Sequence, residues 1–167
     1  MVVFGSAIWR ERIYLEHFRA LTHACRILQV EKIVDVGEPT RIKMNVTIPV
    51  EELGRQPAPL VSRLLSESMA GFMTYFDDSL GKSGVFAAYC AHGVLPVLAR
   101  HGASDSDGIR ADSEYVAALD VREDMTEVEM QAVADNALAW YRKHSLQETA
   151  VNTAMLLLRY QPTGCDT

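Results

Sequence analysis

Residues 41–48 show the clearest alternation of hydrophobic and polar side chains in the chain. The apolar positions are Ile42, Met44, Val46 and Ile48. This period of two is typical of a β-strand with one buried face and one hydrated face. A single strand cannot satisfy its own backbone hydrogen-bonding groups. We therefore expect residues 33–36 to pair with it as an antiparallel hairpin, or a second chain to supply the partner.

Most of the remaining apolar spacing is helical. Apolar residues three and four positions apart predict a first helix over residues 8–28. Further helices are predicted over 59–80, 85–99 and 112–119, with a connector at 51–58 and an exposed loop at 101–111. Two capping-box patterns, beginning at Thr126 and Ser145, place the last helices at 127–143 and 146–160. The predicted fold class is mainly α (α+β): about six helices packed as one helical domain with a small antiparallel β-hairpin near residues 32–48.

The composition is that of an ordinary globular domain. A length of 167 residues suits a single domain covering residues 1–167. The formal net charge of −6 favours solubility and disfavours non-specific binding to nucleic acid or to an anionic membrane. The longest apolar runs are too short to cross a bilayer, and the amino-terminal residues do not form a secretory signal. We therefore expect no contact with a membrane.

The three cysteines, Cys25, Cys90 and Cys165, are far apart and form no CxxC pair. This spacing predicts neither a disulfide framework nor a structural zinc site, and reduced thiols in the cytoplasm are the simplest interpretation. The five histidines form no HExxH motif. We therefore predict no metal and no cofactor.

The loop at 103–114 resembles a calcium-binding EF-hand loop in part. Asp105, Asp107 and Glu114 match its third, fifth and twelfth positions, whereas Ala103 stands where the first carboxylate is needed. We interpret the loop as a solvated turn and leave open whether it binds a cation.

Two further motifs receive structural interpretations. Leu80–Ser83 ends like a phosphate-binding P-loop, but Phe76 occupies the position of the required glycine, and the preceding residues are predicted to be helical. We therefore exclude nucleotide binding by this motif. Cys90 and His92 are two apart on a predicted helix and cannot face each other, so we interpret Cys90 as a buried, unreactive thiol.

Charged residues suggest a surface for partners. A stripe along the first helix consists of Arg12, Glu16, Arg19, His23 and Arg26. It is either a solvated helix face or a surface that docks onto an acidic protein. The acidic patch consists of Glu123, Asp124, Glu127 and Glu129. It suits a helix N-terminus, and it would also attract a basic partner.

The polar positions of the 41–48 segment support another interpretation. They are Arg41, Lys43, Asn45 and Thr47. This face, with Pro49 and the predicted helix from residue 59, resembles ribbon-helix-helix repressors, whose paired strands enter the DNA major groove. The resemblance implies a dimeric DNA-binding regulator. That family has a full helix between strand and turn, whereas here only four residues separate Pro49 from Gly54.

The sequence contains no converging polar motif. We therefore expect a non-catalytic protein-interaction or assembly/regulatory subunit that acts through contacts with another protein or with a second copy in a homodimer. The candidate partner-binding residues are Arg12, Glu16, Arg19, Arg26, Arg41, Lys43, Glu123, Asp124 and Glu127. The alternatives are a ribbon-helix-helix-like DNA-binding regulator that uses the 41–48 strand, and an enzyme whose site is assembled from distant residues.

Overall fold

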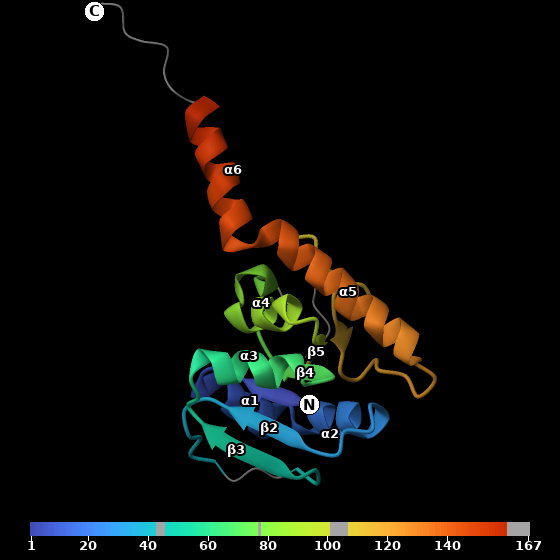
Figure 1. Cartoon of the computed structure of the whole chain (residues 1–167). Helices are drawn as coiled ribbons and strands as arrows, with labels where there is room; N and C mark the ends of the chain where they lie inside the picture. Colours follow the sequence, from blue (N-terminus) through green and yellow to red (C-terminus); the bar gives the residue numbers. More distant parts are fainter. Residues whose placement is uncertain (43–45, 77, 101–106, 160–167) are drawn as a thin grey trace, which may run out of the picture.

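The computed structural model describes residues 1–42, 46–76, 78–100 and 107–159. They form a sheet of six parallel strands in the order β3-β2-β1-β4-β5-β6 (Figure 1). The strands are β1 (Val2–Phe4), β2 (Ile33–Val36), β3 (Val50–Gly54), β4 (Ala70–Met73), β5 (Leu95–Leu98) and β6 (Val116–Ala117). The protein is therefore an α/β fold. The prediction of a helical domain with an antiparallel hairpin is wrong. The sequence misled because parallel strands buried on both faces lack the alternation of apolar and polar residues that marks a half-exposed strand.

Helices cover both faces of the sheet. The helical elements are α1 (Ala7–Glu16), α2 (Phe18–Ile27), α3 (Ala58–Ser66), the 3₁₀ helix η1 (Leu80–Lys82), α4 (Gly84–Ala91), α5 (Glu127–His144) and α6 (Leu146–Arg159). On one face, side chains of α1 and α2 pack with Val3 and Phe72. On the other face, side chains of α3 and α4 pack with Val2 and Met73. The strands alternate between two cores, as expected for a sheet covered on both sides.

The contact of α4 with the sheet depends on Gly71. The Tyr89 hydroxyl donates a hydrogen bond to the Phe72 carbonyl oxygen at 3.1 Å. A Cβ atom at Gly71 would lie 2.6 Å from the Tyr89 ring. Only a glycine lets this ring lie flat against the middle of the sheet, because such a distance is well inside van der Waals contact.

The segment at 41–48 differs from its prediction. None of its described residues lies in a strand, and residues 43–45, which include Lys43 and Met44, lie outside the described part. Ile42, Val46 and Ile48 pack against the core from an irregular segment, so their alternation reflects burial without a strand. The strand forms later, as β3, where a connector was predicted. The DNA-binding interpretation thus lacks its structural premise in the described residues.

Three other segments were predicted to contain more helix than they have. The predicted helix over 59–80 is α3 followed by β4, and the one over 85–99 is α4 followed by β5. Residues 112–119 contain turns and β6 instead of a short helix. The predicted first helix divides into α1 and α2 at His17. Short apolar runs fit a buried strand as well as a helix, and this ambiguity caused the first two errors.

The carboxyl-terminal helices confirm their predictions. Helices α5 and α6 occupy 127–144 and 146–159, one residue from the predicted ends. The capping box is formed: the Glu129 N–H donates to Thr126 Oγ1 at 3.2 Å, and the Thr126 N–H donates to Glu129 Oε2 at 2.7 Å. Across the described ranges, no helix is both long enough and apolar enough to span a membrane.

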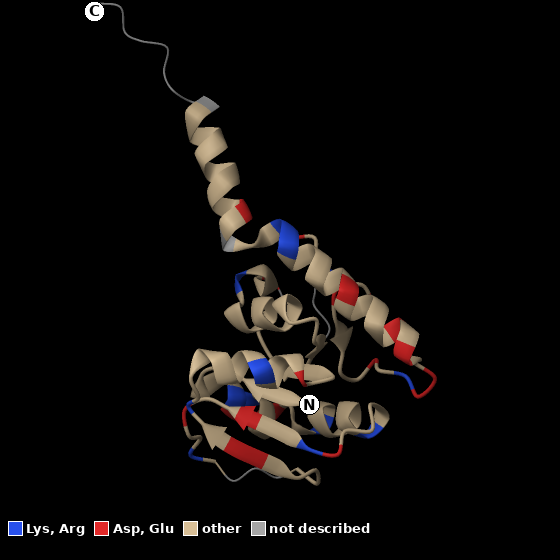
Figure 2. Cartoon of the chain, in the orientation of Figure 1, with Lys and Arg blue, Asp and Glu red and all other residues tan. Residues whose placement is uncertain are grey.

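The two edges of the sheet are short or charged. Strand β6 has two residues. Strand β3, at the opposite edge, exposes Glu51 and Glu52, and Figure 2 shows acidic residues along this strand. Lys32 pairs with Glu51 at 2.6 Å.

Candidate ligand site at the carboxyl ends of β1 and β4

The order of the strands reverses between β1 and β4. From β1 the chain proceeds outward through β2 and β3, and then returns to the other side of β1 to form β4, β5 and β6. In open α/β sheets, the loops at the carboxyl ends of the two strands beside such a switch point separate, and ligands bind in the crevice between them. The fold therefore directs attention to the ends of β1 and β4.

A cavity of about 440 Å³ lies at this switch point. Its lining residues are Phe4, Ser6, Trp9, Ile13, Met73, Thr74, Tyr75, Ser83, Gly84, Val85 and Ala88. They come from the ends of β1 and β4 with the residues that follow them, and from the first two turns of α1 and α4. The loop after β1 approaches α4 closely, since a Cβ atom at Gly5 would lie 3.0 Å from a methyl group of Val85. Gly5 also has φ of +131°, which favours glycine.

Two helix N-termini open at this cavity. Ser6 precedes α1 and makes no side-chain cap, whereas Ser83 caps α4 by accepting a hydrogen bond from the Phe86 N–H at 3.2 Å. The other N–H groups in a first helical turn have no partner within the helix. The space in front of Gly84 is open, because a Cβ atom placed there meets nothing within 4 Å. These N–H groups and the helix dipoles favour an anion.

Three aromatic rings gather beside the cavity. The Trp9 ring centroid lies 5.2 Å from that of Tyr75 and 5.2 Å from that of Phe76. The Arg12 guanidinium lies 5.1 Å from the Trp9 ring centroid. Phe76 remains 59% exposed. The cluster thus combines rigid aromatic surface with access from solvent.

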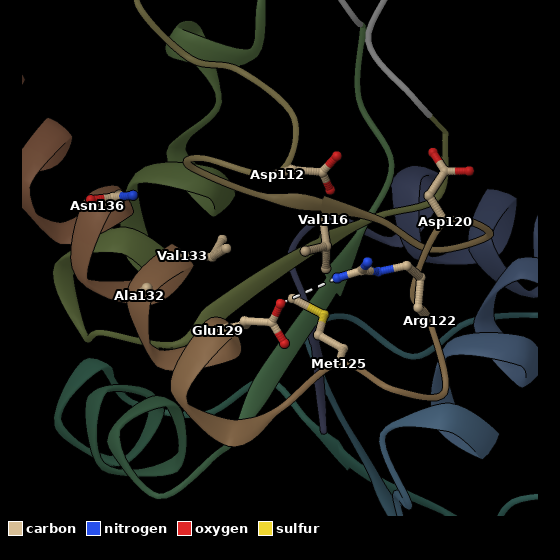
Figure 3. Close-up of a pocket in the computed structure, with 9 residues that line it drawn as sticks. All are labelled: Asp112, Val116, Asp120, Arg122, Met125, Glu129, Ala132, Val133 and Asn136. Atoms are coloured by element: carbon tan, nitrogen blue, oxygen red, sulfur yellow. Dashed lines mark hydrogen bonds and ion pairs between the residues drawn. The ribbon is translucent and has the colours of Figure 1, made fainter.

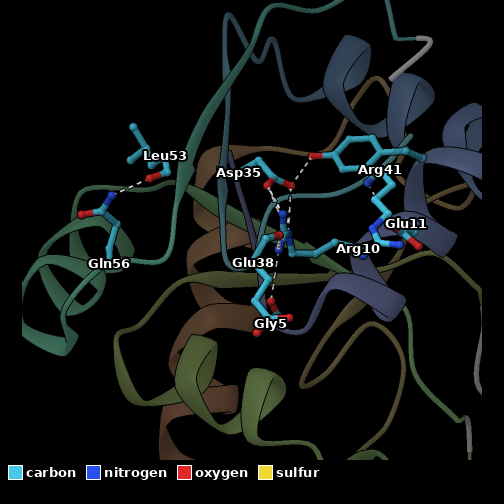
Figure 4. Close-up of polar contacts among 9 residues, drawn as sticks. Gly5, Arg10, Glu11, Asp35, Glu38, Arg41, Leu53 and Gln56 are labelled. Atoms are coloured by element: carbon cyan, nitrogen blue, oxygen red, sulfur yellow. Dashed lines mark hydrogen bonds and ion pairs between the residues drawn. The ribbon is translucent and has the colours of Figure 1, made fainter. Parts of the chain in front are cut away.

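The other side of β1 is filled by a buried ion pair (Figure 4). Arg10 Nη2 lies 2.5 Å from Asp35 Oδ1, and both residues are almost inaccessible to solvent. The Tyr14 hydroxyl donates to Asp35 Oδ2 at 2.8 Å, and Arg10 Nη1 donates to the Glu38 carbonyl oxygen at 2.7 Å. Burial, together with the nearby Asp35 carboxylate, raises the pKa of Tyr14 far above its usual range. The network joins α1 to β2 and to the loop after β2.

A second cavity, of about 430 Å³, borders this network. It shares Phe4 and Ser6 with the switch-point cavity and extends toward the ends of β2 and β3. Glu38 and Arg55, which form an ion pair, both line it. Its charged residues are therefore already paired with each other.

A third cavity, of about 580 Å³, lies between β6 and α5 (Figure 3). Arg122 Nη2 and Glu129 Oε1 are 3.3 Å apart across it. Glu129 also completes the capping box of α5, and the Thr126 hydrogen bonds hold the pKa of Glu129 below its usual value. Glu129 thus has a structural role in starting α5, and Arg122 pairs with it.

The predicted partner-binding residues are dispersed, and several pair within the molecule. Arg26 Nη1 lies 2.8 Å from Glu123 Oε1, so the basic stripe and the acidic patch meet in one chain. Arg12 pairs with Glu16 at 3.1 Å. Arg19 lies over the Phe18 ring. These contacts support the structural interpretation of both charged features, while their role with partners stays a prediction.

The remaining predicted partner-binding residues lie elsewhere. The backbone N–H of Arg41 donates to Glu11 Oε1 at 3.1 Å. Asp124 lies 3.7 Å from Arg122, and Glu127 is in the first turn of α5. Lys43 falls outside the described residues.

The other predicted motifs have clear surroundings. Glu114, the last position of the supposed calcium loop, is buried and accepts a hydrogen bond from the Arg110 N–H at 2.8 Å. Residues 101–106 lie outside the described part, and the described residues contain no cluster of metal-binding side chains. Cys90 is buried as predicted, and burial raises the pKa of its thiol well above the usual value.

Sequence reasoning missed the switch-point cavity. The segment after β1 was considered only as a possible signal sequence, and residues 59–80 were predicted as one helix, whereas they contain β4 and lead into η1 just before α4. A usable signal was present: the short apolar run Val2–Phe4 followed by Gly5 and Ser6 is typical of a strand that leads into a helix. No protein-family model matches this chain, and no curated protein matches it significantly.

Proposed function

We propose that this chain binds a phosphorylated ligand with a planar ring, of the mononucleotide class, in the switch-point cavity. One observation carries the proposal: the ends of β1 and β4 and the first turns of α1 and α4 line the same cavity. Strand order by itself is a fold-level analogy, so the assignment depends on the chemistry of the lining residues.

The phosphate end belongs at the helix N-termini. Backbone N–H groups of α1 and α4, with the hydroxyls of Ser6, Thr74 and Ser83, are donors suited to phosphate oxygens. The open space at Gly84 lets a phosphate approach the backbone of α4 without a side chain between them. This arrangement needs no lysine or arginine in the lining.

The ring end belongs at the aromatic cluster of Trp9, Tyr75 and Phe76. Stacking on aromatic side chains is the usual way for proteins to hold a base without reading its edge. Within the described lining there is no carboxylate, amide or basic side chain to bind the hydroxyl groups of a sugar ring. A base is therefore favoured over a hexose as the ring.

One nucleotide is favoured over a dinucleotide. In dinucleotide-binding sheets, an acidic residue after β2 binds the ribose of the second nucleotide. Here Asp35, near the end of β2, is fully buried, and its carboxylate binds Arg10 and Tyr14. The first loop also has a single glycine, Gly5, in place of the three-glycine fingerprint.

The first test measures nucleotide binding to the full chain by isothermal titration calorimetry. Adenosine and uridine monophosphates and diphosphates are compared with ribose 5-phosphate and inorganic phosphate. We expect the nucleotides to bind at least about fivefold more tightly than ribose 5-phosphate, because a stacked base contributes ~1–3 kcal/mol. Equal affinity for ribose 5-phosphate would contradict the role of the aromatic cluster.

A substitution at Gly84 separates binding from folding. Gly84→Asp places a carboxylate at the first position of α4, where it favours the helix dipole but repels a phosphate. We expect nucleotide affinity to fall at least about tenfold while the thermal midpoint is unchanged or higher. Val128→Asp is the matched control, since it adds the same charge to the first turn of α5 at a site outside the cavity. Unchanged affinity in the Gly84 variant would place the phosphate elsewhere.

Protein contacts are our second proposal, and the exposed Arg19 side chain on α2 and the exposed apolar surface of α6 favour them. The test is charge reversal by Arg19→Glu, which should break a complex recovered from the native host while leaving the thermal midpoint nearly unchanged. An intact complex would remove Arg19 from the contact. A cytoplasmic location is also proposed, and the free, buried thiols of Cys25 and Cys90 support it.

A further inference from the structure

Helix α6 exposes a large amount of hydrophobic surface. Five large apolar side chains of α6 are 43–69% exposed: Val151, Met155, Leu156, Leu157 and Leu158. Figure 1 shows α6 projecting away from the sheet and the other helices. A single helix of 14 residues is only marginally stable in water without packing. A helix with this exposure therefore needs a surface to cover it.

The apolar residues of α6 share a face. At 3.6 residues per turn, one side of the helix carries Ala150, Val151, Ala154, Met155, Leu157 and Leu158, with Gln147 as the polar residue of this side in the first turn. The opposite side carries Glu148, Thr149, Asn152 and Thr153, with Leu156 as the exception. The helix is thus amphipathic, although every one of its described side chains from 147 to 158 is exposed.

We infer that α6 pairs in an antiparallel manner with α6 of a second copy of this chain. The centre of the apolar face is its own complement under a two-fold axis that passes between residues 154 and 155. Val151 of one copy then faces Leu158 of the other, and the small Ala154 faces the larger Met155. A two-fold interface requires such self-complementarity. Matching large with small residues fills the line of contact between the two α6 helices, which we call the seam.

Charge favours the antiparallel direction. A parallel pair would place the two copies of Glu148 together, and likewise Arg142 and Lys143 at the end of α5. The antiparallel pair separates these like charges and aligns the helix dipoles favourably. It also places the sheet and remaining helices of one copy at one end of the seam and those of the other copy at the opposite end, because α6 projects from one side of the molecule (Figure 1).

A second copy fits α6 better than a lipid bilayer does. At 14 residues the helix is shorter than the ~20 residues that a bilayer span requires. A net charge of −6 would repel the chain from an anionic membrane surface. The seam involves a single short helix from each copy, so we expect a dimer with micromolar affinity, weaker than one formed by a standard-sized interface.

Sedimentation equilibrium of the full chain tests the pairing between about 1 and 200 μM. We expect a reversible monomer–dimer equilibrium. Met155→Glu should weaken it at least about tenfold, because it buries a carboxylate in the seam. Asn152→Glu is the matched control, since it adds the same charge to the polar side of α6 and should leave the dimer intact. A monomer across the whole range, equal weakening by both substitutions, or binding to phosphatidylcholine vesicles in place of dimerisation would overturn the proposal.

Disulfide trapping tests the direction, in chains that also carry Cys165→Ser. A mixture of Val151→Cys and Leu158→Cys chains should form a crosslinked heterodimer under mild oxidation, because these positions face each other in the antiparallel pair. Cys25 and Cys90 are buried and do not interfere. Faster crosslinking of Val151→Cys chains with themselves would show a parallel pair and overturn the assignment.

Discussion

At the carboxyl ends of the strands, the structure differs between the two sides of β1. Toward β2, the protein places its own cation, Arg10, against its own carboxylate, Asp35, and buries both. Toward β4, it leaves a cavity of about 440 Å³ lined by hydroxyl groups, aromatic rings and helix N-termini. Helix α1 contributes to both sides. The comparison indicates that this edge is stabilised on one side and left available for a ligand on the other.

The side toward β2, filled by the Arg10–Asp35 pair (the closed side), also fixes the shape of the cavity on the side toward β4 (the open side). Arg10 reaches the carbonyl oxygens of Gly5 and Glu38, so one side chain holds the loops after both β1 and β2. Gly5 in turn lies against Val85 at the start of α4. A rigid network beside the cavity therefore fixes the loop that borders it, as preorganised binding sites require.

The largest expected effect is the loss of stability when the buried Arg10–Asp35 pair on the closed side is broken. Asp35→Ala leaves the buried Arg10 charge without its partner, and we expect a loss of ~3–5 kcal/mol in the free energy of unfolding, measured by urea denaturation. Glu123→Ala is the control: it breaks the exposed pair with Arg26 and should leave stability nearly unchanged. A similarly small loss for both variants would show that the buried pair does not hold the edge together.

A smaller effect is expected from a substitution on the open side, and it should change ligand affinity instead of stability. Phe76→Ala removes an aromatic side chain that is 59% exposed, so stability should change little. Nucleotide affinity, measured by titration calorimetry, should fall by ~1–3 kcal/mol as stacking is lost. Met69→Ala, at the opposite end of β4, should not affect affinity. Equal affinities for both variants would break the distinction between the two sides.

The smallest effect concerns pH and the far end of α1. Burial and the nearby Arg100 cation, with Arg12 in the same direction, lower the pKa of His17, while Glu16 opposes them. Because the folded-state pKa lies below that of the unfolded chain, near 6.5, this contribution to stability is complete above pH 6.5 and decreases as pH falls toward the folded-state value.

We therefore expect the urea midpoint of the wild type to fall more between pH 7.5 and pH 5 than that of His17→Phe. The phenylalanine variant lacks the titrating group, and the Nε2 atom of His17 has no hydrogen-bond partner to lose. Parallel pH profiles for the two proteins would show that His17 does not titrate with folding.

Local signals predicted the elements that depend on local chemistry. The Thr126 capping box starts α5 as expected, and the apolar run at 33–36 is a strand. The parallel strands β4 and β5 were missed, because a run such as Ala70–Met73 is buried on both faces and carries no alternation. Gly93, with φ of +65°, marks the break between α4 and β5.

The candidate site was not predictable from sequence spacing. Its lining combines residues 4–13 with residues 73–88, and only the strand order brings these segments together. The predicted hairpin would have excluded that order, since it made the 33–36 strand antiparallel to its neighbour. The charged residues selected from the sequence lie mainly on surfaces, where pairing within the chain is common.

The charged edge strand β3 has a consequence for how copies of this chain meet. Unpaired backbone groups along a sheet edge invite further strands to add, which is the route to amyloid-like aggregation. Glu51 and Glu52 oppose this route by electrostatic repulsion, and the opposite edge, β6, offers only two residues as a template. Concentrated solutions of this protein should therefore resist fibril formation.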